Sequence, residues 1–150
     1  MNATTKQIDI VTIQMVKESS LRSQYRTISE PKDVWSIANP LVGQKDREHF
    51  GVICVDIKNQ PTHIAIVSIG NINSSIVHPR EVYKTAILSN SASIILFHNH
   101  PSGNPEPSDS DIDITRRLVE AGKLMGIEVL DHIIVGDGEE FLSMKELQLM

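Results

Sequence analysis

Alternating and continuous runs of apolar residues predict the strands of this chain. Apolar and polar residues alternate roughly from Ile8 to Met15, which predicts a first strand, and a polar arm follows up to residue 28. Apolar runs bounded by turn residues predict later strands at 51–57, 62–69, 93–97, 127–130 continued by 132–135, and 141–142. The turn formed by residues 58–61 separates the first two of these later strands and indicates an antiparallel hairpin.

Three segments between the strands have the spacing of helices. Pro31 suits the first turn of one helix, which Pro40 ends, and Pro79 suits the first turn of a second. A third helix begins near Ser108, after a loop rich in Pro, Gly, Ser and Asn. The apolar faces of the three helices comprise Val34, Trp35, Ala38 and Leu41, then Val82, Tyr83, Ala86 and Ile87, then Ile112, Thr115, Leu118, Val119, Gly122 and Met125. This order predicts a mixed α/β sandwich over residues 29–150, with residues 1–28 as an N-terminal strand and arm.

The size and composition of the chain fit one globular domain. Of its 150 residues, 40% are hydrophobic and 22% are charged, which excludes disorder as a description of the whole chain. Its apolar runs are far shorter than the ~20 residues of a membrane span. Its first residues lack the apolar core of a secretory signal. We therefore expect a cytoplasmic domain that does not enter a membrane.

The charge of the chain disfavours nucleic acid as a partner. Lysine and arginine number 14 against 19 aspartates and glutamates, which gives a formal net charge of −5. The compact basic cluster of Arg116, Arg117 and Lys123 is interrupted by the acidic Glu120 and fits a solvated helix face. Neutralisation of phosphates supplies most of the affinity for duplex DNA, so a domain without a basic stripe is not expected to bind it.

The single cysteine narrows the metal chemistry that the chain can support. Cys54 alone can form neither an internal disulfide nor a cysteine-rich zinc site. A zinc nucleobase deaminase is excluded as well, because its site needs two cysteines. We expect Cys54 to be an inert core residue.

Two histidines, His98 and His100, directly follow the predicted strand at 93–97. Side chains at positions i and i+2 of an extended segment point the same way, so the two imidazoles can converge on one point. Histidines at the end of a hydrophobic run are costly unless their polar atoms are satisfied. Imidazole is also the commonest metal ligand in proteins, so the pair indicates a metal site, although this spacing alone has low specificity.

A carboxylate farther along the chain strengthens this indication. Asp111 lies eleven residues after His100, and Ser108 as the N-cap would place Asp111 at the third helical position. Two imidazole nitrogens and one carboxylate oxygen leave the fourth tetrahedral position of a zinc ion to water, whose pKa zinc lowers to about 7. The same Ser-x-x-Asp spacing is also typical of a capping box, so a purely structural role for Asp111 stays open.

The string HNHPSGNPEPSDSD at residues 98–111 resembles the metal signature of the JAMM metalloproteases, which is His-x-His, seven residues, Ser, two residues and Asp. The segments HPREV at 78–82 and DHIIVG at 131–136 extend the resemblance to the RadC-like branch of the MPN/JAB1 superfamily. The resemblance implies a cytidine-deaminase-like α/β sandwich with a mixed central sheet. It also implies one Zn²⁺ per chain, held by His98, His100 and Asp111.

A catalytic glutamate and a catalytic serine are further implications of the resemblance. In the superfamily, a glutamate near the start of the first hairpin strand is the general acid/base toward the zinc-bound water, and Glu48 fits that position. Glu81 is its rival; we favour Glu48 because Glu81 lies in the first turn of a predicted helix, where the helix dipole already explains a carboxylate. Ser108 would support the oxyanion or the water. For Asp131 and His132 we expect a hydrogen-bonding role that faces the sheet.

The implied activity is zinc-dependent hydrolysis of amide or isopeptide bonds in a peptide or protein-conjugate substrate. Two other classes stay open. One is a DNA-associated repair or nuclease-related factor, because family members are commonly labelled as DNA repair proteins. The other is an MPN interaction domain without catalysis. Many family members carry a helix-hairpin-helix region before the JAMM domain, and the 47 residues before Glu48 are too few for it, so we expect no such region.

Overall fold

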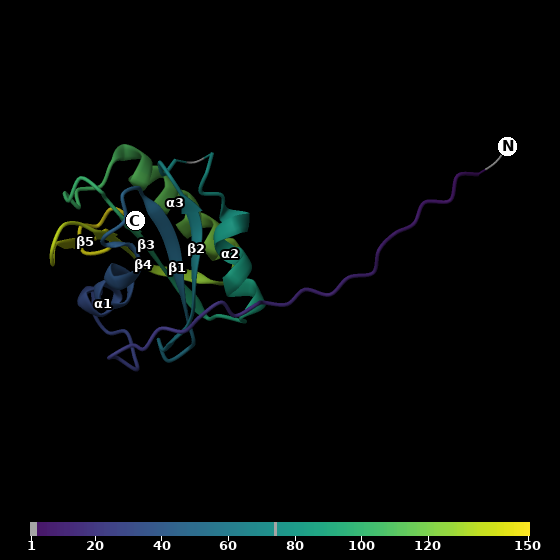
Figure 1. Cartoon of the computed structure of the whole chain (residues 1–150), viewed down its shortest axis with the longest axis horizontal. Helices are drawn as coiled ribbons and strands as arrows, with labels where there is room; N and C mark the ends of the chain where they lie inside the picture. Colours follow the sequence, from purple (N-terminus) through teal and green to yellow (C-terminus); the bar gives the residue numbers. More distant parts are fainter. Residues whose placement is uncertain (1–2, 74) are drawn as a thin grey trace.

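The computed structural model describes residues 3–73 and 75–150. From Pro31 onward the chain forms a five-stranded sheet with helices on both faces (Figure 1). In chain order the elements are α1 (Pro31–Val42), β1 (His49–Val55), β2 (Pro61–Ile69), α2 (Pro79–Leu88), β3 (Ser93–Asn99), α3 (Asp109–Met125), β4 (Glu128–Val135) and β5 (Phe141–Ser143). Each helix and strand predicted after residue 28 is present, and β1 and β2 form the expected antiparallel hairpin. None of the described helices has the length and apolar character that crossing a membrane requires.

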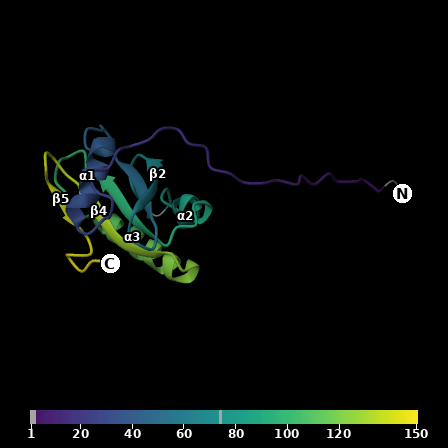
Figure 2. The same cartoon turned by 90° about the horizontal axis from the view of Figure 1, so that it is seen from below.

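The strand order β2-β1-β3-β4-β5 makes the sheet mixed. The neighbours β3 and β4 are parallel and are connected through α3, whereas the other neighbouring pairs are antiparallel. One face of the sheet is covered by α1 and the opposite face by α2 and α3 (Figures 1 and 2). This arrangement confirms the predicted mixed α/β sandwich.

The side chains of the central strands alternate between two cores. Ile53 and Ile95 pack in the core that includes α1, whereas Val52 and Leu96 pack in the core that includes α2 and α3. Successive residues of a strand face opposite sides of the sheet, so the even-numbered positions of β3 point toward α3. His98 therefore projects to the side of the sheet on which α3 begins.

The predicted first strand at residues 8–15 is wrong. Residues 3–27 form no helix or strand, and the side chains of Ile8, Ile10 and Ile13 are exposed. Alternation alone does not make a strand, because the backbone groups of a strand need a neighbour to pair with. The chain joins the fold at Ile28, whose N–H donates to the carbonyl of Asn59 at 2.9 Å.

Three details of the predicted helices are also wrong. In α2, Ile87 is exposed, whereas Val82, Tyr83 and Ala86 of the predicted apolar face are buried. Helix α1 continues through Pro40 to Val42, because a proline in the last turn removes only its own N–H and Gly43 still donates to the carbonyl of Asn39 at 2.8 Å. In α3, Met125 is exposed and Ile114 is buried in its place. The buried stripe of α3 consists of Asp111, Ile114, Thr115, Leu118 and Gly122.

Candidate metal centre

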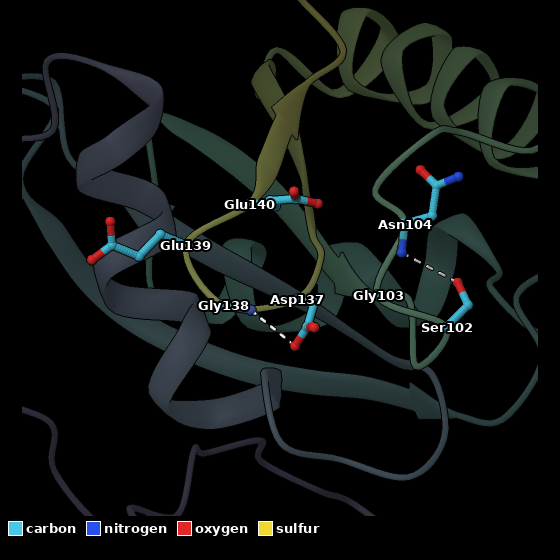
Figure 3. A pocket seen from close by; sticks show the side chains of 7 residues that line it. All are labelled: Ser102, Gly103, Asn104, Asp137, Gly138, Glu139 and Glu140. Carbon is cyan, nitrogen blue, oxygen red and sulfur yellow. Dashed lines mark hydrogen bonds between the residues drawn. The ribbon is translucent and has the colours of Figure 1, made fainter.

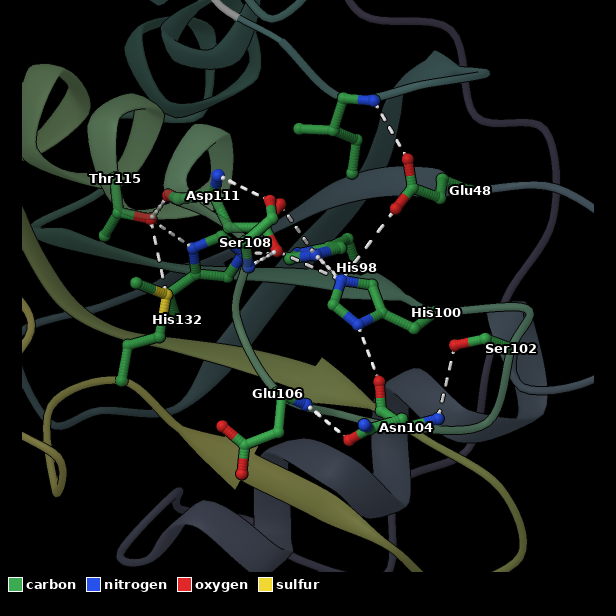
Figure 4. Close-up of polar contacts among 12 residues, drawn as sticks. Glu48, His98, His100, Ser102, Asn104, Glu106, Ser108, Asp111, Thr115 and His132 are labelled. Carbon is green, nitrogen blue, oxygen red and sulfur yellow. Dashed lines mark hydrogen bonds and ion pairs between the residues drawn. The ribbon is translucent and has the colours of Figure 1, made fainter.

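The start of β1, the end of β3 and the first turn of α3 meet at one place in the fold (Figure 4). Antiparallel pairing sets Phe50 opposite His98, so the start of β1 lies beside the end of β3. The loop after β3 turns the chain back, and Ser108 caps α3 with Asp111 at the third helical position, as the sequence predicts. The fold thereby brings the first turn of α3 to the two histidines.

The side chains of His98, His100 and Asp111 converge at this point. The Nε2 atoms of the two histidines lie 3.0 Å apart. The two carboxylate oxygens of Asp111 lie 3.0 Å from Nε2 of His100 and 3.3 Å from Nε2 of His98. The side chains of His98 and Asp111 are 0% and 2% exposed, whereas that of His100 is 12% exposed. The nitrogen and oxygen donors therefore face a common point that approaches the surface at His100.

The hydrogen bonds of His100 determine which of its nitrogens carries a proton. Its Nδ1 lies 2.8 Å from the backbone carbonyl of Asn104, which can only accept, so Nδ1 is the donor. In the neutral ring, Nε2 then carries a lone pair toward His98 and Asp111. Electron-rich atoms this close together repel one another unless a cation lies among them, either a proton or a metal ion. The donor set fits zinc, which binds imidazole nitrogen and carboxylate oxygen.

The same proximity shifts two pKa values in the site. Burial disfavours the charged form of Asp111, but the close approach of the His100 and His98 ring nitrogens, together with the N–H of Ser108, holds the pKa of this carboxyl far below its ordinary value. Burial acts to lower the pKa of His100, yet its hydrogen bonds to Asp111 and to the Asn104 carbonyl raise that pKa above 6.5 overall. Asp111 is therefore an anion at neutral pH, as a metal ligand must be.

Glu48 lies beside the converging side chains and is set back from them. Its Oε1 lies 3.8 Å from Nε2 of His100, while its Oε2 accepts a hydrogen bond from the N–H of Ile72 at 3.0 Å. Glu48, His98 and His100 each offer a ligand atom within 4.8 Å of the others. The Glu48 carboxylate is thus anchored by one oxygen and presents the other toward His100.

Asn99 holds the segment that carries Glu48. Alternation along β3 directs this side chain away from its two histidine neighbours. Its Oδ1 accepts from the N–H of His49 at 2.7 Å, and its Nδ2 donates to the carbonyl of Arg47 at 3.1 Å. Asn99 therefore ties the backbone on both sides of Glu48 to the strand that carries the histidines, a role that sequence reasoning missed.

Glu81, the rival glutamate, lies in the first turn of α2. Both of its carboxylate oxygens accept from Nζ of Lys84, at 3.0 and 2.8 Å, and this exposed pair lowers the pKa of Glu81. The structure thus brings Glu48, and not Glu81, to the histidines.

Ser108 and Asp111 form a reciprocal cap at the site. The hydroxyl of Ser108 accepts from the N–H of Asp111 at 3.1 Å, and the N–H of Ser108 donates to Oδ2 of Asp111 at 2.9 Å. This Oδ2 is the oxygen that contacts His100. A carboxylate oxygen has two lone pairs, so the capping role and the ligand role of Asp111 are compatible.

Two further buried side chains lie behind His98. Its Nδ1 is 2.7 Å from Nε2 of His132, and Nδ1 of His132 is 2.6 Å from the hydroxyl of Thr115. Burial, together with the neighbouring His98, lowers the pKa of His132 well below 6.5. The hydrogen-bonding role predicted for His132 is confirmed, and Asp131 likewise accepts from the Ser143 hydroxyl at 2.6 Å. Sequence reasoning placed Thr115 only on an apolar helix face, although its i, i+4 spacing from Asp111 was a usable signal.

A surface pocket of about 570 Å³ lies next to the loop that supplies the Asn104 carbonyl (Figure 3). Its lining consists of Ser102, Gly103, Asn104, Asp137, Gly138, Glu139 and Glu140. The two loops that form it are joined by a hydrogen bond from the N–H of Asp137 to the carbonyl of Gly103 at 2.9 Å. Three carboxylates in its lining make the surface beside the site acidic.

A family model for the RadC-like JAB domain matches residues 28–149 of this chain. The chain belongs to this family. The match begins at Ile28, where the chain joins the fold, and it includes all the residues of the candidate centre. The family that the sequence motifs indicate is therefore confirmed.

Curated relatives of this RadC-like JAB domain carry the name UPF0758 protein. The relative from Methanosarcina barkeri is 48% identical over 129 residues, which are 86% of this chain and 56% of the relative. The relative from Desulfitobacterium hafniense is 50% identical over 119 residues, or 79% of this chain and 52% of the relative. The one from Syntrophomonas wolfei is 53% identical over 116 residues, or 75% of this chain and 49% of the relative. The chain thus spans about half the length of the curated relatives that it matches.

Proposed function

We propose that this RadC-like JAB domain is a zinc-dependent hydrolase of amide bonds in a peptide or protein-conjugate substrate. The convergence of His98, His100 and Asp111, with their nitrogen and oxygen atoms 3.0–3.3 Å apart, is the observation that carries the proposal. Three protein ligands with one open position are typical of catalytic zinc sites, whereas structural sites are closed by four. Membership of the JAB superfamily supports a hydrolase as well.

Zinc bound by these residues would polarise a substrate carbonyl and lower the pKa of a bound water to about 7. Oε1 of Glu48 would take a proton from the attacking water and pass it to the leaving amine, acting first as general base and then as general acid. Its 3.8 Å distance from His100 suits this role better than ligation, because Asp111 approaches the same Nε2 to 3.0 Å. The Ile72 N–H holds the other oxygen of Glu48, which keeps Oε1 in place.

Ser108 has a separate part in the proposed reaction. Its hydroxyl oxygen accepts from the Asp111 N–H, so its own proton stays available for donation. That proton can be donated to the oxyanion that develops when an amide carbonyl is attacked.

The charge of the surface supports a peptide substrate over a nucleic acid. Asp137, Glu139 and Glu140 line the pocket beside the site and would repel phosphates. Within the basic cluster of α3, Lys123 pairs with Glu120 at 2.9 Å, which weakens that cluster as a phosphate site.

Metal analysis of the purified protein tests the proposed site. We expect about one zinc per chain in the wild type, as the three-ligand site requires. Glu48→Gln should retain the zinc, whereas His98→Ala and Asp111→Asn should lose it. The matched control is Glu81→Gln, which alters the rival glutamate on α2 and should retain the zinc. Stoichiometric zinc in both ligand variants would contradict the assignment.

The reaction class is tested with a library of peptides and isopeptides. We expect cleavage by the zinc-loaded wild type and by Glu81→Gln, and cleavage slower by about 10²–10⁴-fold with Glu48→Gln, the usual contribution of a general acid/base. Lack of zinc-dependent cleavage of any amide would instead favour an interaction domain. Salt-dependent retention on DNA, beyond that of a charge-matched control protein, would favour a DNA-associated factor.

A further inference from the structure

A chain of buried hydrogen bonds connects two of the proposed ligands behind the site (Figure 4). The Thr115 hydroxyl lies 2.6 Å from the backbone carbonyl of Asp111 and 2.6 Å from Nδ1 of His132. Nε2 of His132 lies 2.7 Å from Nδ1 of His98. Thr115, His132 and His98 are each 0% exposed, so water does not compete for these contacts. These hydrogen bonds therefore connect helix α3 to strand β4 and strand β4 to strand β3.

The direction of each hydrogen bond follows from the single proton of the Thr115 hydroxyl. The carbonyl of Asp111 can only accept, so the short contact between the two oxygens requires the hydroxyl proton. The Thr115 oxygen then has only lone pairs to offer His132, and Nδ1 of His132 must be the donor.

The tautomer of His132 determines which ring nitrogen of His98 carries a proton. A ring buried without a charged partner of its own is neutral, so a proton on Nδ1 of His132 leaves Nε2 bare. The bare Nε2 accepts from Nδ1 of His98, and the neutral His98 ring then carries a lone pair on Nε2. That Nε2 is the atom that faces His100 and Asp111.

We propose that Thr115 and His132 are positioning residues that hold His98 in the tautomer whose Nε2 is free to bind a metal ion. The inference rests on the proposed function for the identity of the bound group and adds to it the residues that prepare the ligand. Groups that hydrogen-bond a ligating histidine commonly fix its tautomer and orientation, and their loss lowers metal affinity by roughly 10–100-fold.

Loss of the Thr115 hydroxyl should reverse the tautomers of His132 and His98 and the direction of the hydrogen bond between them. In Thr115→Val, a proton on Nδ1 of His132 would be buried without an acceptor, which is unfavourable. The proton moves to Nε2 of His132, which then donates to His98. His98 in turn carries its proton on Nε2 and donates it to Asp111, so this nitrogen no longer offers a lone pair to a metal.

Nitrogen NMR of zinc-free protein labelled with ¹⁵N-histidine reads these tautomers directly, because long-range ¹H–¹⁵N spectra separate protonated from bare ring nitrogens. The signals of His132 are those that His132→Phe lacks. We expect a protonated Nδ1 and a bare Nε2 for His132 in the wild type and in Thr115→Ser, and the reverse in Thr115→Val. A bare Nδ1 in the wild type, or an unchanged tautomer in Thr115→Val, would overturn the proposal.

Zinc affinity, measured by competition with a chromophoric chelator, is the second readout. We expect affinity about 10–100-fold weaker in Thr115→Val, and wild-type affinity in Thr115→Ser, which restores the hydroxyl. Ile114→Val is the matched control, because it removes a methyl group from the neighbouring buried position of α3 and should leave affinity unchanged. Wild-type affinity in Thr115→Val would overturn the role in metal binding. If the wild type binds no zinc, the proposed function fails, and the spectra of the zinc-free protein still decide whether the tautomers are set as proposed.

Discussion

Under the proposed function, the carboxylate of Asp111 has two roles, in capping helix α3 and in binding zinc, and one substitution separates them. Its Oδ2 accepts the N–H of Ser108 at 2.9 Å and lies 3.0 Å from Nε2 of His100. An asparagine keeps a carbonyl oxygen for Ser108 but loses the negative charge of the ligand. We therefore expect Asp111→Asn to retain helix α3 and to lose most of its zinc affinity.

The expected magnitude follows from the coupling of zinc binding to folding. Zinc at 1,000 times its Kd stabilises the folded state by about 4.1 kcal/mol. Loss of a direct ligand should weaken binding by at least the ~100-fold that loss of a supporting hydrogen bond can cost. The same zinc concentration is then at most about 10 times the Kd and stabilises Asp111→Asn by no more than about 1.4 kcal/mol. The zinc-dependent gain in the free energy of unfolding should therefore fall by at least about 2.7 kcal/mol.

Asp33 supplies the matched control for this experiment. Its buried carboxylate also stands at the third position of a helix, α1, and accepts from the N–H groups of Ser29 and Glu30 at 2.8 and 3.2 Å. Urea unfolding with and without zinc should show the wild-type gain in Asp33→Asn and a strongly reduced gain in Asp111→Asn. An equal gain in the two variants would refute the ligand role of Asp111 and leave only its capping role.

Three further predictions concern the surroundings of the site. Below pH 6.5, His132 binds a proton in the unfolded chain but stays neutral in the folded protein, because its pKa is lowered there. The free energy of unfolding of the zinc-free protein should therefore decrease as the pH falls below 6.5, by up to about 1.4 kcal/mol per pH unit from this group. Urea unfolding at two pH values should show a smaller loss in His132→Phe, and an equal loss in that variant would contradict the assignment. Asn99→Leu should retain zinc but cleave substrate at least about tenfold more slowly, because a reaction slows when a catalytic group is misplaced. A wild-type kcat/KM in this variant would contradict the role of Asn99 in positioning Glu48. In Gly51→Ala, the new Cβ would clash with the ring of the buried Phe97, so the free energy of unfolding should fall by about 1–3 kcal/mol. The double variant with Phe97→Leu should lose less than the sum of the two single changes, and strict additivity would argue against the clash.

The convergence of His98, His100 and Asp111 was predictable from the sequence because the geometry of these residues is local. His98 and His100 share a direction through the alternation of one strand, and Ser108 and Asp111 are fixed to each other by one helical cap. The family signature then joins these two local patterns. The position of Glu48 also followed from the family pattern, and the pairing of Phe50 with His98 is the contact that brings it there.

The supporting residues were harder to predict because they depend on pairing between distant strands. His132 reaches His98 only because β4 lies parallel to β3, with Leu96 opposite His132. Nothing in the local pattern of residues 127–135 specifies that register. The N-terminal segment shows the opposite failure, because Ile10 and Ile13 have the alternation of a strand but pair with no strand in the part of the chain that the structure describes.

X-ray diffraction from zinc-loaded crystals, recorded at the zinc absorption edge, tests the central claim most directly. The account predicts one anomalous peak per chain, about 2.0–2.2 Å from Nε2 of His98, Nε2 of His100 and a carboxylate oxygen of Asp111. Glu48 should lie outside the coordination sphere. A peak coordinated by Glu48 in place of Asp111, or no peak among these side chains, would contradict the account.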